Sequence, residues 1–78
     1  MNVVYAIHSK FGYLRFGSYS VATAAPIPSL ASLYSSLKQV KERIKRINGH
    51  GVWIKDKRYT RTLEPRIQMF SLHEEEIQ

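Results

Sequence analysis

The sequence contains no cysteine, so neither a disulfide framework nor a thiolate zinc site is available to stabilise the chain. Its three histidines, His8, His50 and His73, do not stand at the spacing of a helical metal motif. No apolar run approaches the ~20 residues of a membrane-spanning helix, and the N-terminus lacks the pattern of a signal peptide. We therefore expect no metal, no other cofactor and no membrane association, and a cytoplasmic protein of a cell or a virus.

Acidic residues are also scarce, with six Asp and Glu against twelve Lys and Arg. A general acid or base requires a histidine or a carboxylate in a pocket. Glu42, Asp56 and Glu64 instead lie among cations, which keep carboxylates ionised and exposed. We predict that the protein is not an enzyme. A nuclease that pairs a histidine with Arg58 is the alternative within that class.

The residues that are present predict a globular chain, because 44% are hydrophobic and 12% are aromatic. A domain of this size buries only about 60% of the surface that its unfolded chain exposes, so it holds one core. We expect a single domain over residues 1–78, in which residues 74–78 form a flexible acidic tail.

The first half of the chain predicts a β-hairpin followed by a loop. Residues 3–9 and 13–19 alternate like strands, and residues 10–12 supply a turn in which Gly12 takes a positive φ. We expect the aromatic residues of this half to form core and cross-strand pairs: Tyr5, Tyr13, Phe16, Tyr19 and Tyr34. Residues 21–29 contain two prolines, which predicts neither a helix nor a central strand.

The clearest pattern in the chain is a helix over residues 36–48. Apolar side chains recur there at helical spacing, at Leu37, Val40, Ile44 and Ile47. Ser35 is the expected N-cap, and Gly49 is the expected left-handed residue that ends the helix.

The second half predicts another hairpin and a last strand. Residues 52–55 form its first arm, residues 56–58 its polar tip and residues 59–63 its return arm. After Pro65, residues 66–73 alternate again and predict a strand. This order favours an α+β fold: a small antiparallel sheet, built from the N-terminal hairpin and the C-terminal strands, with one helix packed on one face.

Positive charge is concentrated in the second half, where ten of the twelve Lys and Arg fall between Lys38 and Arg66. Within residues 53–61, aromatic residues are interspersed with cations, a mixture that neutralises phosphates and stacks on unpaired bases. The candidate binding residues are Lys38, Lys41, Lys45, Trp53, Lys55, Lys57, Arg58, Tyr59 and Arg61. The alternative is that Trp53 and Tyr59 pack onto the core and that the helix cations form a solvated face.

Three parts of the chain carry a resemblance: residues 4–7 with 12–15, residues 33–38, and residues 66–70. In these parts the chain resembles a loose class of small bacteriophage-encoded proteins. The resemblance covers most of the chain. It implies an α+β fold and an accessory role aimed at host machinery or host defence, and it assigns no functional residues.

Together these features predict a phage-type protein that binds RNA or a ribonucleoprotein and interferes with a host defence or toxin system. An alternative is a protein inhibitor whose basic hairpin docks on an acidic or nucleic-acid-binding surface of a host enzyme. A third is a structural protein that forms a homodimer through a free sheet edge.

Overall fold

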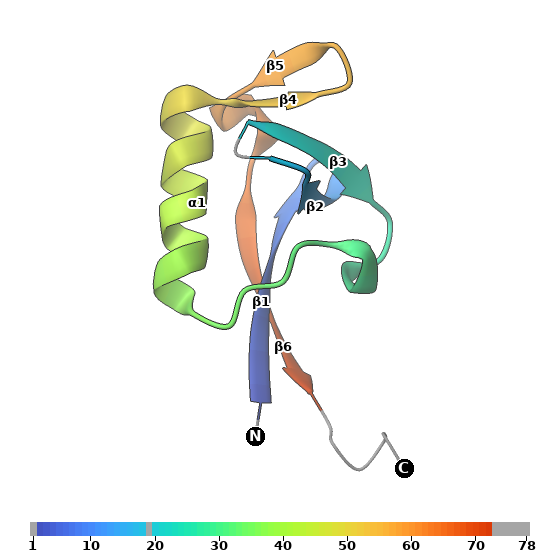
Figure 1. The fold of residues 1–78 in the computed structure, drawn as a ribbon, viewed down its shortest axis with the longest axis vertical. Helices are drawn as coiled ribbons and strands as arrows, with labels where there is room; N and C mark the ends of the chain where they lie inside the picture. Colours follow the sequence, from blue (N-terminus) through green and yellow to red (C-terminus); the bar gives the residue numbers. More distant parts are fainter. Residues whose placement is uncertain (1, 19, 73–78) are drawn as a thin grey trace.

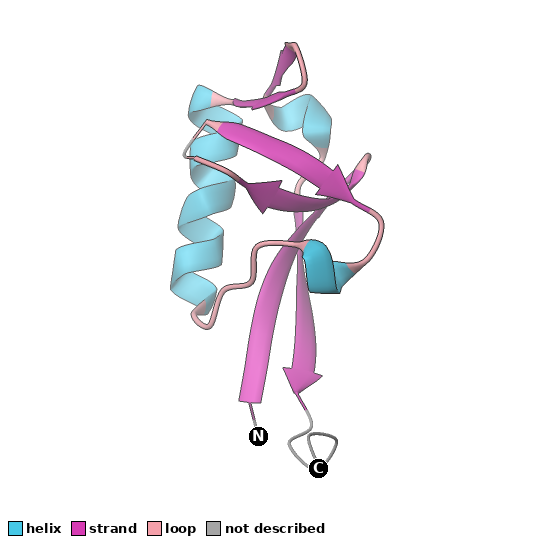
Figure 2. Ribbon diagram, turned by 45° about the vertical axis from the view of Figure 1, so that its right-hand side comes forward, coloured by secondary structure: helices cyan, strands magenta, loops and turns pink. Residues whose placement is uncertain are grey.

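The computed structural model describes residues 2–18 and 20–72, and it contains a six-stranded, mostly antiparallel sheet with one α-helix on one face (Figures 1 and 2). This confirms the predicted α+β fold. The elements are β1 (Asn2–Ser9), β2 (Gly12–Phe16), β3 (Val21–Ala25), η1 (Pro28–Leu30), α1 (Leu37–His50), β4 (Val52–Ile54), β5 (Lys57–Tyr59), η2 (Arg61–Leu63) and β6 (Arg66–Leu72). The second strand of the predicted hairpin is too long, because β2 ends at Phe16, while Tyr19, His73 and the acidic tail lie outside the described residues.

The predicted N-terminal hairpin is present, and its turn is tightly built. β1 pairs with β2 through His8 opposite Tyr13 and Ser9 opposite Gly12. The buried Ser9 hydroxyl donates to the Gly12 carbonyl at 2.8 Å and accepts from the Phe11 N–H at 3.2 Å. Gly12 has a φ of 128°, and a Cβ there would lie 2.7 Å from the Ala25 carbonyl oxygen. Only glycine fits this turn.

The prediction of a loop over residues 21–29 is wrong, because β3 occupies its first half. β3 pairs antiparallel with β2 and parallel with β4, so the sheet runs in the order β5-β4-β3-β2-β1-β6. Pro26 and Pro28 follow the last residue of β3 and remove no ladder donor from it. Pro28 instead opens the 3₁₀ helix η1, where its fixed φ suits the first position.

The predicted helix is confirmed, and both of its predicted ends are wrong. Ser36, not Ser35, is the N-cap, and its hydroxyl accepts from the Gln39 N–H at 3.4 Å. Gly49 continues the helix, and Gly51 ends it with a φ of 85°. A Cβ at Gly51 would lie 2.9 Å from the Tyr59 carbonyl oxygen. The helix therefore ends where β5 leaves no room for a side chain.

The core lies between α1 and the sheet. Val40 and Ile47 of α1 are buried against residues from β1, β2, β4 and η2, among them Ile7, Leu14 and Leu63. Tyr5, Phe16, Tyr34 and Ile67 are partly buried against the same cluster, as expected for the aromatic residues and for the last strand. The predicted return arm over residues 59–63 is wrong in its second half, since residues 61–63 form η2 and bury Leu63 completely.

Candidate functional site

The β4–β5 hairpin carries most of the predicted site residues, and its turn lies earlier than the sequence predicts. Ile54 is paired with Lys57, so Lys55 and Asp56 alone form the turn, with Lys55 at a φ of 57°. Lys57 and Arg58, predicted at a polar tip, belong to strand β5 instead. Neighbouring residues of a strand point to opposite faces. The hairpin therefore divides the predicted site between two surfaces.

The outer face of the hairpin presents Trp53 and Arg58, which are paired across the two strands. Val52 and Ile54 on either side of Trp53 are buried, whereas Trp53 itself is 44% exposed. The alternative that Trp53 packs into the core is therefore wrong. The Nε of Arg58 donates to the carbonyl oxygen of His50 at 3.1 Å. This contact joins the outer face to the C-terminal end of α1.

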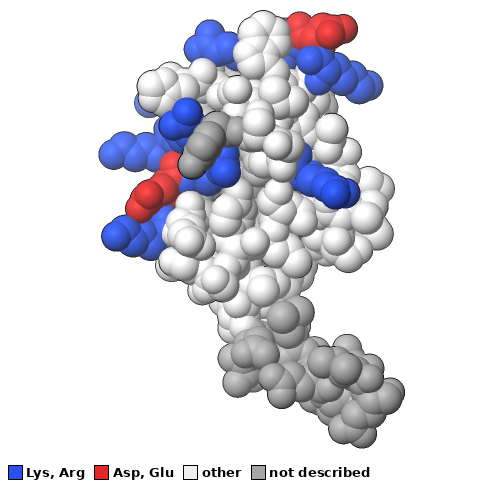
Figure 3. Space-filling model, in the orientation of Figure 1, with Lys and Arg blue, Asp and Glu red and all other residues white. Residues whose placement is uncertain are grey.

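A groove of about 940 Å³ lies beside that end of the helix, and we call it the helix groove. Its cationic lining residues are Lys41, Lys45, Arg46 and Arg61, its one acid is Glu42, and the imidazole of His50 also lines it. Arg61 comes from η2, so the fold brings it to the cations of α1. Lys38 is exposed one turn before Lys41, on the same flank and outside the groove. Figure 3 shows Lys and Arg side chains along α1 and around the hairpin.

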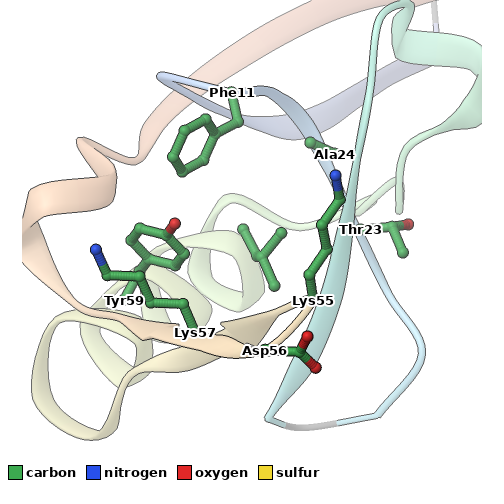
Figure 4. Close-up of a pocket in the computed structure, with 8 residues that line it drawn as sticks. Phe11, Thr23, Ala24, Lys55, Asp56, Lys57 and Tyr59 are labelled. Carbon is green, nitrogen blue, oxygen red and sulfur yellow. The ribbon is translucent and has the colours of Figure 1, made fainter.

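The inner face of the hairpin borders a second groove of about 650 Å³, which we call the hairpin groove. It is lined by Phe11, Thr23, Ala24, Ile54, Lys55, Asp56, Lys57 and Tyr59 (Figure 4). Tyr59 is partly buried against the core, as the alternative interpretation expects. Its ring still meets the Phe11 ring edge to face, with centroids 5.1 Å apart.

Two residues of this region, Lys10 and Phe11, are absent from the sequence-based candidates. The Lys10 Nζ lies 5.2 Å from the Phe11 ring centroid and 5.8 Å from that of Tyr59. The Lys57 Nζ lies 5.4 Å from the Tyr59 ring centroid. Lys10 and Phe11 fall in a segment that the sequence predicts only as a turn. The sequence did contain a signal for them: a cation, Lys10, stands next to an aromatic residue, Phe11, in a turn whose geometry requires neither side chain.

No group of three or more His, Asp or Glu side chains gathers into a metal site within residues 2–18 and 20–72. In the same residues, the single α-helix is too short and too polar to cross a bilayer. No protein-family model matches the sequence, and neither a curated protein nor a solved structure matches the chain. Function is therefore inferred from the two grooves and the hairpin between them.

Proposed function

We propose that this protein binds single-stranded RNA, free or within a ribonucleoprotein, through the helix groove and the outer face of the β4–β5 hairpin. The observation that carries the proposal is a groove lined by four Lys and Arg from α1 and η2, and the bond from Arg58 to His50 ties the hairpin that exposes Trp53 to a residue of that groove. Cations along a groove follow a phosphate backbone, and an exposed indole stacks on a base. Stacking requires bases that are not already paired, which favours a single strand over a duplex.

The helix cations have a simpler explanation, which accounts for only part of the groove. Cations on the polar flank of an amphipathic helix are commonly a solvated surface, so Lys45 and Arg46 need no ligand; they precede the last turn of α1, where His50 is the basic residue. Arg61 is not part of that helix face, because it belongs to η2, so the same explanation does not cover it. Its convergence on the same groove supports a surface that serves an anionic ligand.

The resemblance to small phage proteins supports a role of this binding against a host defence or toxin system. In this interpretation the protein acts in the host cytoplasm, where it occupies an RNA that a host toxin or nuclease requires.

A protein inhibitor is the second candidate, and a different surface favours it. Ile27, Leu30 and Leu33, in the connection between β3 and α1, are each nearly half exposed. Exposed apolar side chains that gather in one segment are a feature of protein interfaces. Under this proposal the basic hairpin provides charge complementarity to an acidic host surface.

Titration with labelled oligouridylate of roughly ten nucleotides, a length within the range of single-strand binding sites, tests the proposal. We expect an affinity that falls steeply as salt rises, and a loss of about 5- to 100-fold for Trp53→Ala, which removes one stacked base. Met69→Ala is the matched control, because Met69 is 63% exposed on β6 and lines neither groove. An oligodeoxythymidylate of the same length tests RNA against DNA.

Absence of binding to either strand at low salt would refute nucleic-acid binding. A pull-down from host lysate after nuclease treatment then tests the inhibitor, with Leu30→Ala as the variant that should lose its partner.

A further inference from the structure

The hairpin groove is a half-open pocket with aromatic residues at its edge and room for a flat ring. Figure 4 shows Phe11 above the opening, Tyr59 on one side with its hydroxyl directed inward, and the Lys55 side chain along the opposite side. Ile54, which is 9% exposed, also lines the groove. The lining thus combines two aromatic rings and two aliphatic side chains with polar and charged residues. Its volume of about 650 Å³ falls within the range of small-ligand sites.

Three cations surround this apolar lining. The ammonium groups of Lys10 and Lys57 both lie within cation–π range of the Tyr59 ring, and Lys55 approaches from the other side. Asp56 is the one acid among the lining residues, and it stands at the turn. Cations gathered around one opening favour an anionic ligand there.

The turn itself does not require Phe11 to be aromatic. It is 47% exposed at a turn whose geometry depends on Gly12 and on the Ser9 hydroxyl, not on the ring of Phe11. The same turn carries Lys10, whose ammonium group lies near the rings of Phe11 and Tyr59, two residues that line the groove.

We propose that the hairpin groove holds one unpaired nucleobase, stacked against Phe11, with the adjoining phosphate bound by Lys10 and Lys57. The inference rests on the proposed function and assigns a second contact point to the same strand. β5 is an edge strand of the sheet, so a flexible oligonucleotide on the outer face of the hairpin can reach the inner face by passing around β5. Trp53 and Phe11 would then hold different bases of one oligonucleotide, and the Tyr59 hydroxyl would offer a hydrogen bond to a base edge.

The experiment compares oligouridylate with an abasic oligomer that has the same number of phosphates. For the wild-type protein we expect tighter binding of the base-bearing strand. Phe11→Leu should lower the affinity for oligouridylate by about 5- to 100-fold, the effect of one lost stacking partner, and leave the abasic oligomer unaffected. Met69→Ala removes an exposed apolar side chain that lines neither groove, and both ligands should bind it as they bind the wild type. Phe11→Tyr should restore the preference.

Quenching of Trp53 fluorescence by saturating oligouridylate should persist in Phe11→Leu, since the strand still reaches the outer face. A circular dichroism melt of each variant verifies that it is folded. Equal oligouridylate affinity for Phe11→Leu and the wild type would overturn the base site and leave the proposed function standing. Competition by uridine 5′-monophosphate as effective as that by the oligomer would show a site for free nucleotides and also overturn it. Failure of the wild type to bind any strand would refute the proposed function itself.

Discussion

Lys45 and Arg61 are far apart in the sequence and line the same groove, so replacing both with glutamine tests whether the fold creates a phosphate-binding surface. Each phosphate neutralised on a single strand contributes about 0.7 to the slope of log affinity against log salt. Loss of two contacts should therefore reduce the magnitude of that slope by about 1.4, and the two contacts contribute about 25-fold to affinity at 0.1 M relative to 1 M salt. Fluorescence anisotropy of labelled oligouridylate over a salt series measures both quantities.

The control removes the same charge from other places. Arg15 on β2 and Arg66 on β6 are exposed and line neither groove. Their joint replacement by glutamine should leave the slope unchanged, because neither guanidinium lines a groove that would hold a phosphate. If both double variants lose slope equally, the strand responds to net charge alone, and a localised helix groove is refuted.

Three further substitutions test the fold by urea unfolding. Gly49→Ala should raise the free energy of unfolding by about 0.5–1 kcal/mol, because Gly49 is helical and a Cβ there meets no atom within 4 Å. Gly51→Ala should lower it by about 1–3 kcal/mol, since its φ is 85° and the Tyr59 carbonyl lies in the way; the reverse order would contradict the observed helix end. Leu63→Ala should lower it by about 2–5 kcal/mol, because Leu63 is fully buried in η2. Leu33→Ala, at an exposed position, should stay within about 0.5 kcal/mol of the wild type, and equal losses would contradict the core assignment.

The elements with a strong local pattern could be predicted from the sequence, and β3 could not. The N-terminal hairpin, α1 and β6 each carry an apolar period of their own. β3 has the sequence Val-Ala-Thr-Ala-Ala, and alanine has little preference for strands. It is a strand because β2 and β4 flank it and because Ala22, 2% exposed, belongs to the core cluster. The information that makes β3 a strand therefore lies in its neighbours β2 and β4 and not in its own residues.

The residue types of the candidate site could be predicted from the sequence, but their division between the two faces of the hairpin could not. Lys, Arg and aromatic residues are read directly, whereas the face that each one occupies depends on where the hairpin turns. A shift of one residue moves every side chain of a strand to the other face. The turn at Lys55 and Asp56 therefore decides that Arg58 lies with Trp53 and that Lys57 lies with Tyr59. Phe11 joins them through a contact that no local pattern encodes.

The parallel pairing of β3 with β4 has a consequence for folding and local opening. It consists of Val21 beside Trp53 and Ala22 beside Ile54, and the whole helix lies between the two strands in the chain. Closing so long a loop opposes early formation of this pairing, so we expect the β4–β5 hairpin to dock late. Because only this short pairing joins the β4–β5 hairpin to the rest of the sheet, we expect the hairpin to open before the whole protein unfolds. Its amide protons should therefore exchange before those of β1 and β6. An oligonucleotide that spans the hairpin and α1 would bind only the docked form and slow that exchange, which makes hydrogen exchange a map of the bound strand.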